Sequence, residues 1–307
     1  MLVLTNLLES LPVFQALSSD MRLRIIQLLA KKNKLSISEL AHKLGVTNGA
    51  MTNHINKLVN AGIIKIEQPE KAHGNSKVCT LELDRIIIVI NELRENQQTY
   101  ESEIKVGHYS SFHVTPSCGL ATPSHVIGQL DDPRYFSHPE RFDAGILWFR
   151  TGFVEYMIPN LLPPNSIVED LTLTMELSSE APTFNNFWPS DIRFYVNDTF
   201  LGIWTSPGDF GDKRGTLSPK WWSNTLNQYG LLKTLTINKS GSFIDGERIG
   251  DISIDLLNIS YDSNISLKLE VRPDSENPGG LTIYGDNFGN HPQNIKVSVS
   301  YVPSSIL

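Results

Sequence analysis

The sequence predicts an α+β multidomain protein in which a small helical domain precedes a larger all-β domain. In the first hundred residues, apolar side chains recur every three or four positions, as in amphipathic helices. From residue 109 onward they alternate with polar side chains over short segments, as in strands. A chain of 307 residues is long enough for two cores. We expect domains over residues 1–98 and 106–307, connected by the polar segment QQTYESEIKVG.

Four helices are expected before the hairpin of the first domain. The first is predicted by leucines at helical spacing, namely Leu4, Leu7, Leu8 and Leu11. Ser19 is expected to cap the second helix, DMRLRIIQLLAKK, and either Ser36 or Ser38 opens the third, ISELAHKL. Gly45 follows the third helix, where glycine commonly provides a left-handed end. Thr47 is then expected to cap the fourth helix.

A β-hairpin is expected after the fourth helix, which stops at Ala61-Gly62. The segments IIKIEQ and KVCTLEL have strand character and flank the loop PEKAHGNS. A short helix, a glycine turn, a second helix and a hairpin follow in the order of a winged helix-turn-helix. In that fold the second helix enters the DNA major groove and the hairpin lies along the DNA backbone.

The segment LSISELAHKLGVTNGAMTNHINKLVNAGIIK resembles the DNA-binding core of ArsR-type bacterial repressors. It follows their pattern of Ala-x-x-Leu-Gly-Val-Ser, then Ser-x-His-Leu, then Leu-x-x-Ala-Gly-Leu-Val. Thr52 stands in place of the serine, and His54 is retained. The resemblance covers residues 1–98 and implies a DNA-binding, dimeric winged helix-turn-helix. It implies nothing about the rest of the chain.

The fourth predicted helix has one apolar side and one polar side. At 100° per residue, Gly49, Asn53, Asn56, Lys57 and Asn60 gather opposite the apolar positions. Asparagine makes bidentate contacts to adenine, so Asn53 and Asn56 are expected to read bases, with Lys57 nearer a phosphate. His54 lies on the flank, where it is either a phosphate contact or a packed imidazole. The predicted DNA-binding residues are Thr47, Asn48, Thr52, Asn53, His54, Asn56, Lys57, Lys71, His73 and Lys77. The alternative interpretation of these residues is a solvated surface.

No metal or cofactor site is expected. Metal-sensing members of the resembling family carry Cys-x-Cys before the turn, or His and carboxylate ligands on the last helix. The corresponding segments here, SISELAHKL and DRIIIVINELREN, have no thiol and no imidazole pair. Cys79 lies in a predicted strand, where a lone cysteine is typical of a small buried side chain. His113, Cys118 and His125 have a spacing that zinc could use, but no fourth ligand lies near them in the sequence.

The segment DRIIIVINELRENQ, residues 84–97, is expected to form a helix with an unusually wide apolar stripe. A stripe wider than one small domain needs indicates a second buried face. In the resembling family the first and last helices pair two subunits, which implies a homodimer here. The residues assigned to dimerisation are Leu4, Leu7, Leu8, Ile86, Ile87, Ile90 and Leu93. The alternative is that this stripe packs against the C-terminal domain.

The second domain is expected to be a β-sandwich of the jelly-roll, galactose-binding-like kind. Short alternating segments such as LTLTMEL, SLKLEV and NIKVSVSY are separated by Pro, Gly, Asn and Asp. Hairpins are expected at Arg150 to Gly152 and at Asn197-Asp198. Many lectins and carbohydrate-binding modules share this architecture, although a fold class alone does not establish a function.

Three loops of the second domain combine aromatic and polar side chains: FNNFWPSDIRF, WTSPGDFGDKRGTLSPKWW and SENPGGLTIYGDNFGNHP. Carbohydrates need flat apolar faces for stacking and polar groups for their hydroxyls. The predicted ligand-binding residues are Trp188, Asp209, Asp212, Arg214, Trp221, Trp222 and Asp286. The alternative is that the tryptophans belong to the core and that the polar clusters are turns.

Charge and composition complete the functional expectation. Residues 1–100 contain 12 Lys and Arg against 9 Asp and Glu, whereas the remainder contains 14 against 24. Two cysteines form no disulfide framework, and the chain has no signal-peptide pattern or membrane-spanning apolar run, so a cytoplasmic protein is expected. We therefore expect a non-enzymatic, homodimeric repressor that binds an inverted-repeat operator in double-stranded DNA and responds to a small effector, a carbohydrate. The alternatives are a carbohydrate-active enzyme with a regulatory head and a regulator whose β domain recruits a protein.

Overall fold

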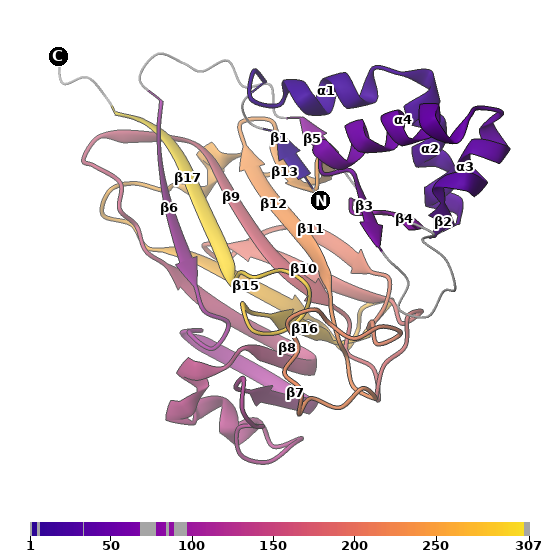
Figure 1. Cartoon of the computed structure of the whole chain (residues 1–307). Coiled ribbons are helices and arrows are strands. Elements are labelled where there is room, and N and C mark those ends of the chain that lie inside the picture. The colour runs from indigo at the N-terminus through magenta and orange to yellow at the C-terminus, as the bar shows by residue number, and fades with distance from the viewer. Residues whose placement is uncertain are drawn as a thin grey trace. The chain divides into compact units, whose positions relative to one another are not determined.

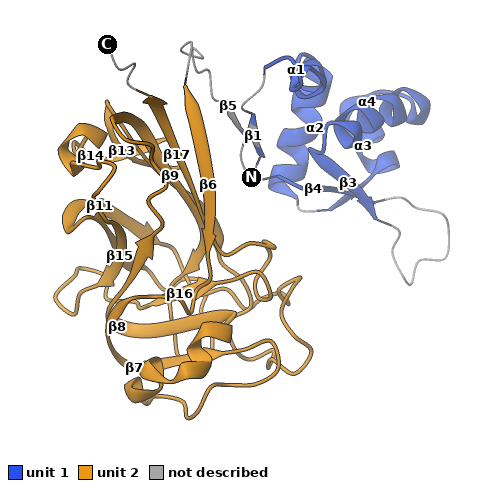
Figure 2. Cartoon of the chain, turned by 90° about the vertical axis from the view of Figure 1, so that its left-hand side faces the viewer, with its two compact units in different colours: residues 1–93 blue, residues 94–307 orange. Residues whose placement is uncertain are grey.

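The computed structural model describes residues 2–4, 7–32, 34–67, 78–83, 86–88 and 97–303. The chain divides into two compact units, residues 1–93 and residues 94–307 (Figure 2). Across these described ranges, no helix has both the length and the apolar character needed to span a membrane.

Unit 1 consists of helices around one core and two small sheets (Figure 1). Its helices are α1 (Leu11–Leu17), α2 (Asp20–Lys31), α3 (Ile37–Leu44) and α4 (Asn48–Asn60). Strand β1 (Leu2–Leu4) pairs in parallel with β5 (Ile86–Ile88), and β4 (Val78–Leu81) lies between β2 (Leu35–Ser36) and β3 (Ile64–Glu67). The fully buried side chains that join the helices include Ile25, Leu29, Leu40, Met51, Ile55 and Leu58.

The predicted boundaries of α3 and α4 are confirmed. Ser36 caps α3 in a reciprocal arrangement with Glu39, in which each side chain accepts a hydrogen bond from the other residue's backbone amide. Gly45 ends α3 with a φ of 68°. The Thr47 hydroxyl accepts a hydrogen bond from the Ala50 amide at 3.3 Å and so caps α4. Gly62, with a φ of 68°, follows the end of α4.

The prediction of a first helix beginning near Leu4 was wrong. Residues 2–4 form a strand, and the first helix begins only at Leu11, with Pro12 in its first turn. Proline favours this position because its φ is already helical and the first amides of a helix have no partner. Pairing with residues 86–88 therefore outweighs the helical spacing of the leucines.

The prediction of a helix over residues 84–97 was wrong for residues 86–88, which form β5. Three consecutive isoleucines occupy this strand, and β-branched side chains are less restricted in a strand than in a helix. Residues 89–96 lie outside the described ranges.

Unit 2 is a large antiparallel β-sandwich. Its strands are β6 (Gln98–Ile104), β7 (Ser111–Ala121), β8 (Ile146–Ile158), β9 (Ser166–Ser178), β10 (Ser190–Val196), β11 (Thr199–Ser206), β12 (Leu231–Asn238), β13 (Gly241–Ile244), β14 (Glu247–Gly250), β15 (Ile265–Val271), β16 (Leu281–Tyr284) and β17 (Ile295–Pro303). Short 3-10 helices occupy Pro133–Ser137, Pro139–Asp143 and Ile254–Leu257.

The two layers of the sandwich are joined through β16. One layer has the order β11, β10, β15, β8 and β7, and the other contains β6, β17, β9, β12, β13 and β14. Strand β16 pairs with residues 146–149 of β8 and with residues 176–178 of β9. The core between the layers includes Leu147, Phe149, Leu173, Leu177 and Leu269. The expectation of an all-β sandwich is confirmed.

The segment expected to be a polar joint is partly a strand of the sandwich. Residues 98–104 form β6, which among the described strands pairs with β17 alone and so lies at an edge of the sheet. Its side chains are mostly exposed. An edge strand with exposed side chains needs no apolar alternation, which is why its sequence resembles a linker.

One of the two predicted hairpins is confirmed and the other was wrong. Asn197 and Asp198 connect β10 to β11 with φ values of 48° and 60°, as a two-residue turn with both φ positive requires. At Arg150 to Gly152 the chain does not turn, because β8 continues from Ile146 to Ile158. Gly152 has a φ of 117°, and a Cβ there would lie 1.8 Å from the His113 carbonyl oxygen.

Candidate nucleic-acid interface and ligand-binding loops

Helix α4 buries one side and exposes the other, as its sequence predicts. Met51, Ile55 and Leu58 are fully buried in the core of unit 1. The opposite side is exposed and consists of Gly49, Asn53, Asn56, Lys57 and Asn60, and Asn48 is exposed at the start of the helix. Thr52 and His54 are half-buried. The helix therefore presents amide side chains and one ammonium group to solvent, while its buried side chains fix it to the core of unit 1.

The predicted DNA-binding residues do not all have free polar atoms. The Thr52 hydroxyl donates to the Asn48 carbonyl oxygen at 2.8 Å, and the Thr47 hydroxyl is used in the helix cap. These two side chains therefore fix the first turn of α4. The predicted hairpin residues Lys71, His73 and Lys77 lie outside the described ranges.

Two of the predicted ligand-binding residues in unit 2 are buried. Asp209 is 0 % exposed and Trp222 is 2 % exposed. Trp222 packs edge-to-face against Trp148 and Phe288, with ring centroids 5.7 Å and 5.2 Å away, and its indole donates to the Asn227 carbonyl. It belongs to a small aromatic core, so of the two adjacent tryptophans Trp221 is the exposed one.

Asp212 and Arg214 have separate hydrogen-bond partners. The Asp212 carboxylate accepts a hydrogen bond from the Tyr229 hydroxyl at 2.7 Å. The Arg214 guanidinium donates to the carbonyl oxygens of Trp222, Ser218 and Pro219 and to the Asn224 side chain. Arg214 therefore holds together the segment that follows it, whereas Asp212 remains exposed at a loop surface.

Exposed aromatic side chains do occur on these loops. Trp188 is 38 % exposed and Trp221 is 40 % exposed, while its neighbour Phe187, which the sequence reasoning missed, is 88 % exposed. The Phe187 amide donates to the Asn185 side chain, and the Trp188 amide donates to the Pro207 carbonyl. Phe187 thus stands on a pinned loop. The aromatic residues of FNNFWP indicated this loop, but the sequence alone did not distinguish the exposed Phe187 from aromatic residues of the core.

A group of buried carboxyls lies near these loops and was also missed. Burial raises the pKa of Asp209 to about 8, while its hydrogen bond from the Ala181 amide acts in the opposite direction. Burial likewise raises the pKa of Glu176 to about 7, against three backbone amides that favour its charged form. The pKa of Glu180 is raised well above its ordinary value by burial and then by the neighbouring Asp209.

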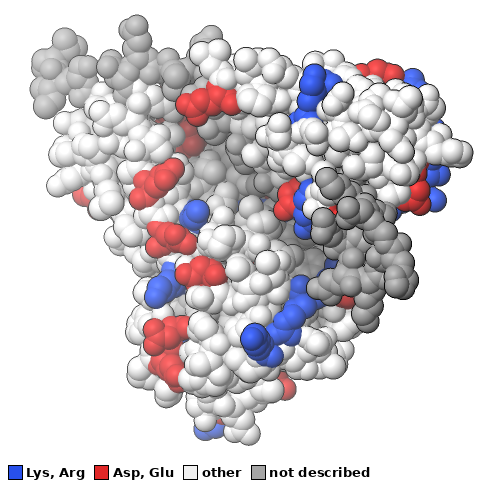
Figure 3. Space-filling view, in the orientation of Figure 1, with Lys and Arg blue, Asp and Glu red and all other residues white. Residues whose placement is uncertain are grey.

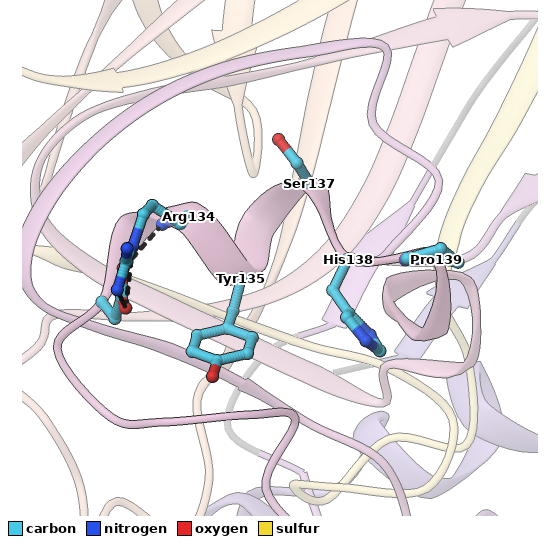
Figure 4. Close-up of a pocket in the computed structure, with 6 residues that line it drawn as sticks. Arg134, Tyr135, Ser137, His138 and Pro139 are labelled. Carbon is cyan, nitrogen blue, oxygen red and sulfur yellow. Dashed lines mark hydrogen bonds and ion pairs between the residues drawn. The ribbon is translucent and has the colours of Figure 1, made fainter.

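A pocket of about 440 Å³ lies on the first 3-10 helices of unit 2 (Figure 4). It is lined by Asp132, Arg134, Tyr135, Ser137, His138 and Pro139. Asp132 holds Arg134 in a forked ion pair, with a closest distance of 2.6 Å. In Figure 4, Tyr135 and His138 project to the same side while Ser137 points away. This pocket contains none of the residues predicted from the sequence.

The dimerisation residues divide by exposure. Leu4 is buried in the core of unit 1, and Ile86 packs against that core. Leu7 and Leu8 are 43 % and 86 % exposed. The backbone of Ile87 lies in β5, while Ile90 and Leu93 are outside the described ranges.

Within the described ranges, no group of three or more His, Cys, Asp and Glu side chains could hold a metal ion. Cys79 and Cys118 are both buried and unpaired with each other.

On the face of unit 2 seen in Figure 3, basic side chains are interspersed among the acidic ones. This face therefore has no extended surface of a single sign.

Residues 19–65 match a family model described as winged helix-turn-helix DNA-binding. That range runs from the cap of α2 to the second residue of β3. No curated protein matches the chain. The N-terminal part therefore contains a winged helix-turn-helix.

Solved structures similar to parts of the chain include transcriptional regulators and one domain of a xylanase. The match to HlyU from Vibrio cholerae N16961 has 23 % sequence identity and a TM-score of 0.22. It covers 24 % of this chain and 76 % of the HlyU chain. An ArsR family transcriptional regulator is 27 % identical over 24 % of this chain and 72 % of its own, also with a TM-score of 0.22. The CBM36-1 domain of a multidomain xylanase from the hindgut metagenome of Trinervitermes trinervoides is 12 % identical over 66 % of this chain and 96 % of its own, with a TM-score of 0.25.

Proposed function

We propose that the chain is a sequence-specific DNA-binding transcription regulator, acting as a repressor, in which α4 reads the major groove. The observation that carries the proposal is the two-sided structure of α4 within the segment that matches the winged helix-turn-helix family. Three fully buried apolar residues hold the helix, and the outward side offers asparagine amides that pair with adenine edges.

Base selection by this surface differs from simple attraction to phosphate. Asn53 and Asn56 are exposed and carry no formal charge, whereas Lys57 beside them supplies one positive charge. Neutral amides add little to counterion release, so their contribution to binding depends on the base they meet. We expect adenines in each half-site of an inverted repeat.

The test is an in vitro binding selection followed by affinity measurements on the selected duplex. Asn53→Ala and Asn56→Ala should each weaken binding by about 1–3 kcal/mol and flatten base preference at one position. Lys57→Ala should weaken binding to all sequences alike and reduce the salt slope by about 1. Gln27→Ala, an exposed change on α2, is the control. Selected sites with G·C pairs at the contacted positions would refute the assignment.

We propose further that unit 2 binds the effector, a carbohydrate. Support comes from exposed Trp188 and Trp221 and from exposed Asp212 and Asp286 on the loops of a β-sandwich. Aromatic faces stack on sugar rings, and carboxylates accept hydrogen bonds from sugar hydroxyls. A ligand can shift DNA binding only if it has different affinities for the two states of the protein.

Thermal-shift measurement of the whole chain against sugars and sugar phosphates tests the effector. We expect a stabilising sugar whose effect is lost in Trp188→Ala and Asp212→Ala and retained in Tyr261→Ala, an exposed aromatic elsewhere in unit 2. The absence of any stabilising sugar would contradict the proposal. Turnover of a sugar would favour a carbohydrate-active enzyme instead, and a protein captured by unit 2 without any sugar would favour a recruiting module.

A further inference from the structure

Gly49 is a helical glycine that the fold does not require. It lies in the first turn of α4, after the cap residue Thr47, and its φ is not in the left-handed region. A Cβ built at this position would meet no atom within 4 Å. Glycine is a poorer helix former than alanine. Neither backbone conformation nor packing explains why the chain carries glycine here.

The position of Gly49 on α4 gives a reason. At 100° per residue, Asn53, Asn56 and Asn60 project within about 40° of Gly49 around the helix axis. Gly49 therefore lies on the centre line of the exposed polar side, about 6 Å along the axis from Asn53 at 1.5 Å per residue. It is on the side opposite the buried Met51 and Leu58.

The other residues on that exposed side also include several with low helix propensity. Asn53, Asn56 and Asn60 are all exposed, and asparagine is among the weaker helix formers. Exposed helix positions without another role usually favour Ala, Glu, Lys or Gln. A glycine and three asparagines on one side therefore indicate that contact with a partner, and not helix stability, determines this surface.

We propose that Gly49 is a close-approach point that lets the first turn of α4 lie directly against the DNA. This inference rests on the proposed DNA-binding function and names a residue that determines how deeply the helix enters the groove. A side chain at position 49 would stand between the helix and the duplex. It would hold the Asn53 and Asn56 amides away from the base edges, where hydrogen bonds lose strength steeply with distance.

The experiment is a size series, Gly49→Ala, Gly49→Gln and Gly49→Leu, in the full chain. All three new residues are good helix formers, so thermal stability should stay equal or rise. Affinity for the selected duplex should fall progressively with side-chain size, by roughly tenfold to a hundredfold for leucine, the range set by the loss of one or two base contacts. Preference for the selected bases should weaken with it. Ala30→Leu makes a similar change of size at an exposed position of α2 and should leave affinity unchanged.

The outcomes separate this inference from the proposed function. If the wild-type chain binds no duplex specifically, the proposed function fails. If the wild type binds and Gly49→Leu binds equally well, only the close-approach role is overturned. If affinity falls together with thermal stability across the series, the glycine has a structural role and the inference is likewise overturned.

Discussion

Asp209 shows how strongly a single side chain depends on its surroundings. The residue is fully buried, its Oδ2 accepts the Ala181 amide at 3.0 Å, and no partner of its Oδ1 is found among the described residues. Burial raises its pKa to about 8, from the 3.8 typical of aspartate. The pKa of Glu180 is also raised well above its usual value, by burial and then by the nearby Asp209. The native state therefore retains protons that the unfolded chain releases.

The stability of unit 2 should consequently fall as pH rises. Between about pH 4 and pH 8, the folded state keeps Asp209 protonated while the unfolded state ionises it, so the unfolded state binds fewer protons. The free energy of unfolding then decreases with pH, by up to about 1.4 kcal/mol per pH unit for each such proton. Asp209→Asn should flatten this slope. The effect should be most visible above pH 7, because below that pH Glu176, with a pKa of about 7, contributes to the slope as well.

Urea denaturation at pH 5.5, 7.0 and 8.5 measures the effect. All 5 tryptophans lie beyond residue 147, so their fluorescence reports on unit 2 alone. The matched control is Asp255→Asn, an exposed carboxylate that should leave the slope unchanged. An equally steep slope in Asp209→Asn and the wild type would show that the carboxyl is not the source.

At the scale of elements, strand β9 fixes two loops through one side chain. The Glu176 carboxylate accepts hydrogen bonds from the amides of Gly230, Asn290 and His291 at 2.8 to 3.0 Å. Gly289 approaches so closely that a Cβ there would lie 2.4 Å from Glu176 Oε1. One fully buried carboxylate thereby connects the start of β12 with the loop before β17.

Glu176→Gln should lower the free energy of unfolding of unit 2 by about 1–3 kcal/mol at pH 8, because a side-chain amide can accept with only one atom and its NH2 group would face backbone donors. Tryptophan-monitored urea denaturation provides the measurement. Glu247→Gln on the exposed side of β14 is the control. Equal stability of the Glu176→Gln variant and the wild type would show that the two loops are held by other contacts.

At the scale of the whole molecule, exposed leucines near the N-terminus provide an apolar surface. We propose a homodimer that uses the N-terminal apolar surface, since Leu7 and Leu8 are exposed beside a core that already buries Leu4. Contiguous exposed apolar surface often marks a site of protein association. Two copies would place two α4 helices on the half-sites of an inverted repeat.

Leu8→Asp should convert the dimer to a monomer, because a charge would be buried without a partner at the interface. Light scattering of the full chain at micromolar concentration gives the mass directly. Leu256→Asp changes an exposed leucine of unit 2 in the same way and should leave the dimer intact. A wild-type chain that is monomeric yet binds its operator fully would remove the proposal.

Local chemistry determined much of the architecture. The caps at Ser36 and Thr47, the left-handed Gly45 and the turn at Asn197-Asp198 depend on residues next to one another in the chain. The alternation of apolar residues likewise predicts an all-β domain without knowledge of its partners. For the same reason the buried and exposed sides of α4 were predictable, since both follow from the period of one helix.

Tertiary structure decided what depends on distant residues. Leu2–Leu4 is a strand because Ile86–Ile88 lies beside it, and β6 is a strand because β17 provides its hydrogen bonds. Trp221 and Trp222 are adjacent in sequence, yet one is 40 % exposed and the other 2 %, because Trp148 and Phe288 surround only the second. Pairing and burial are properties of the space around a residue, and that space is filled by segments that short-range sequence patterns do not identify.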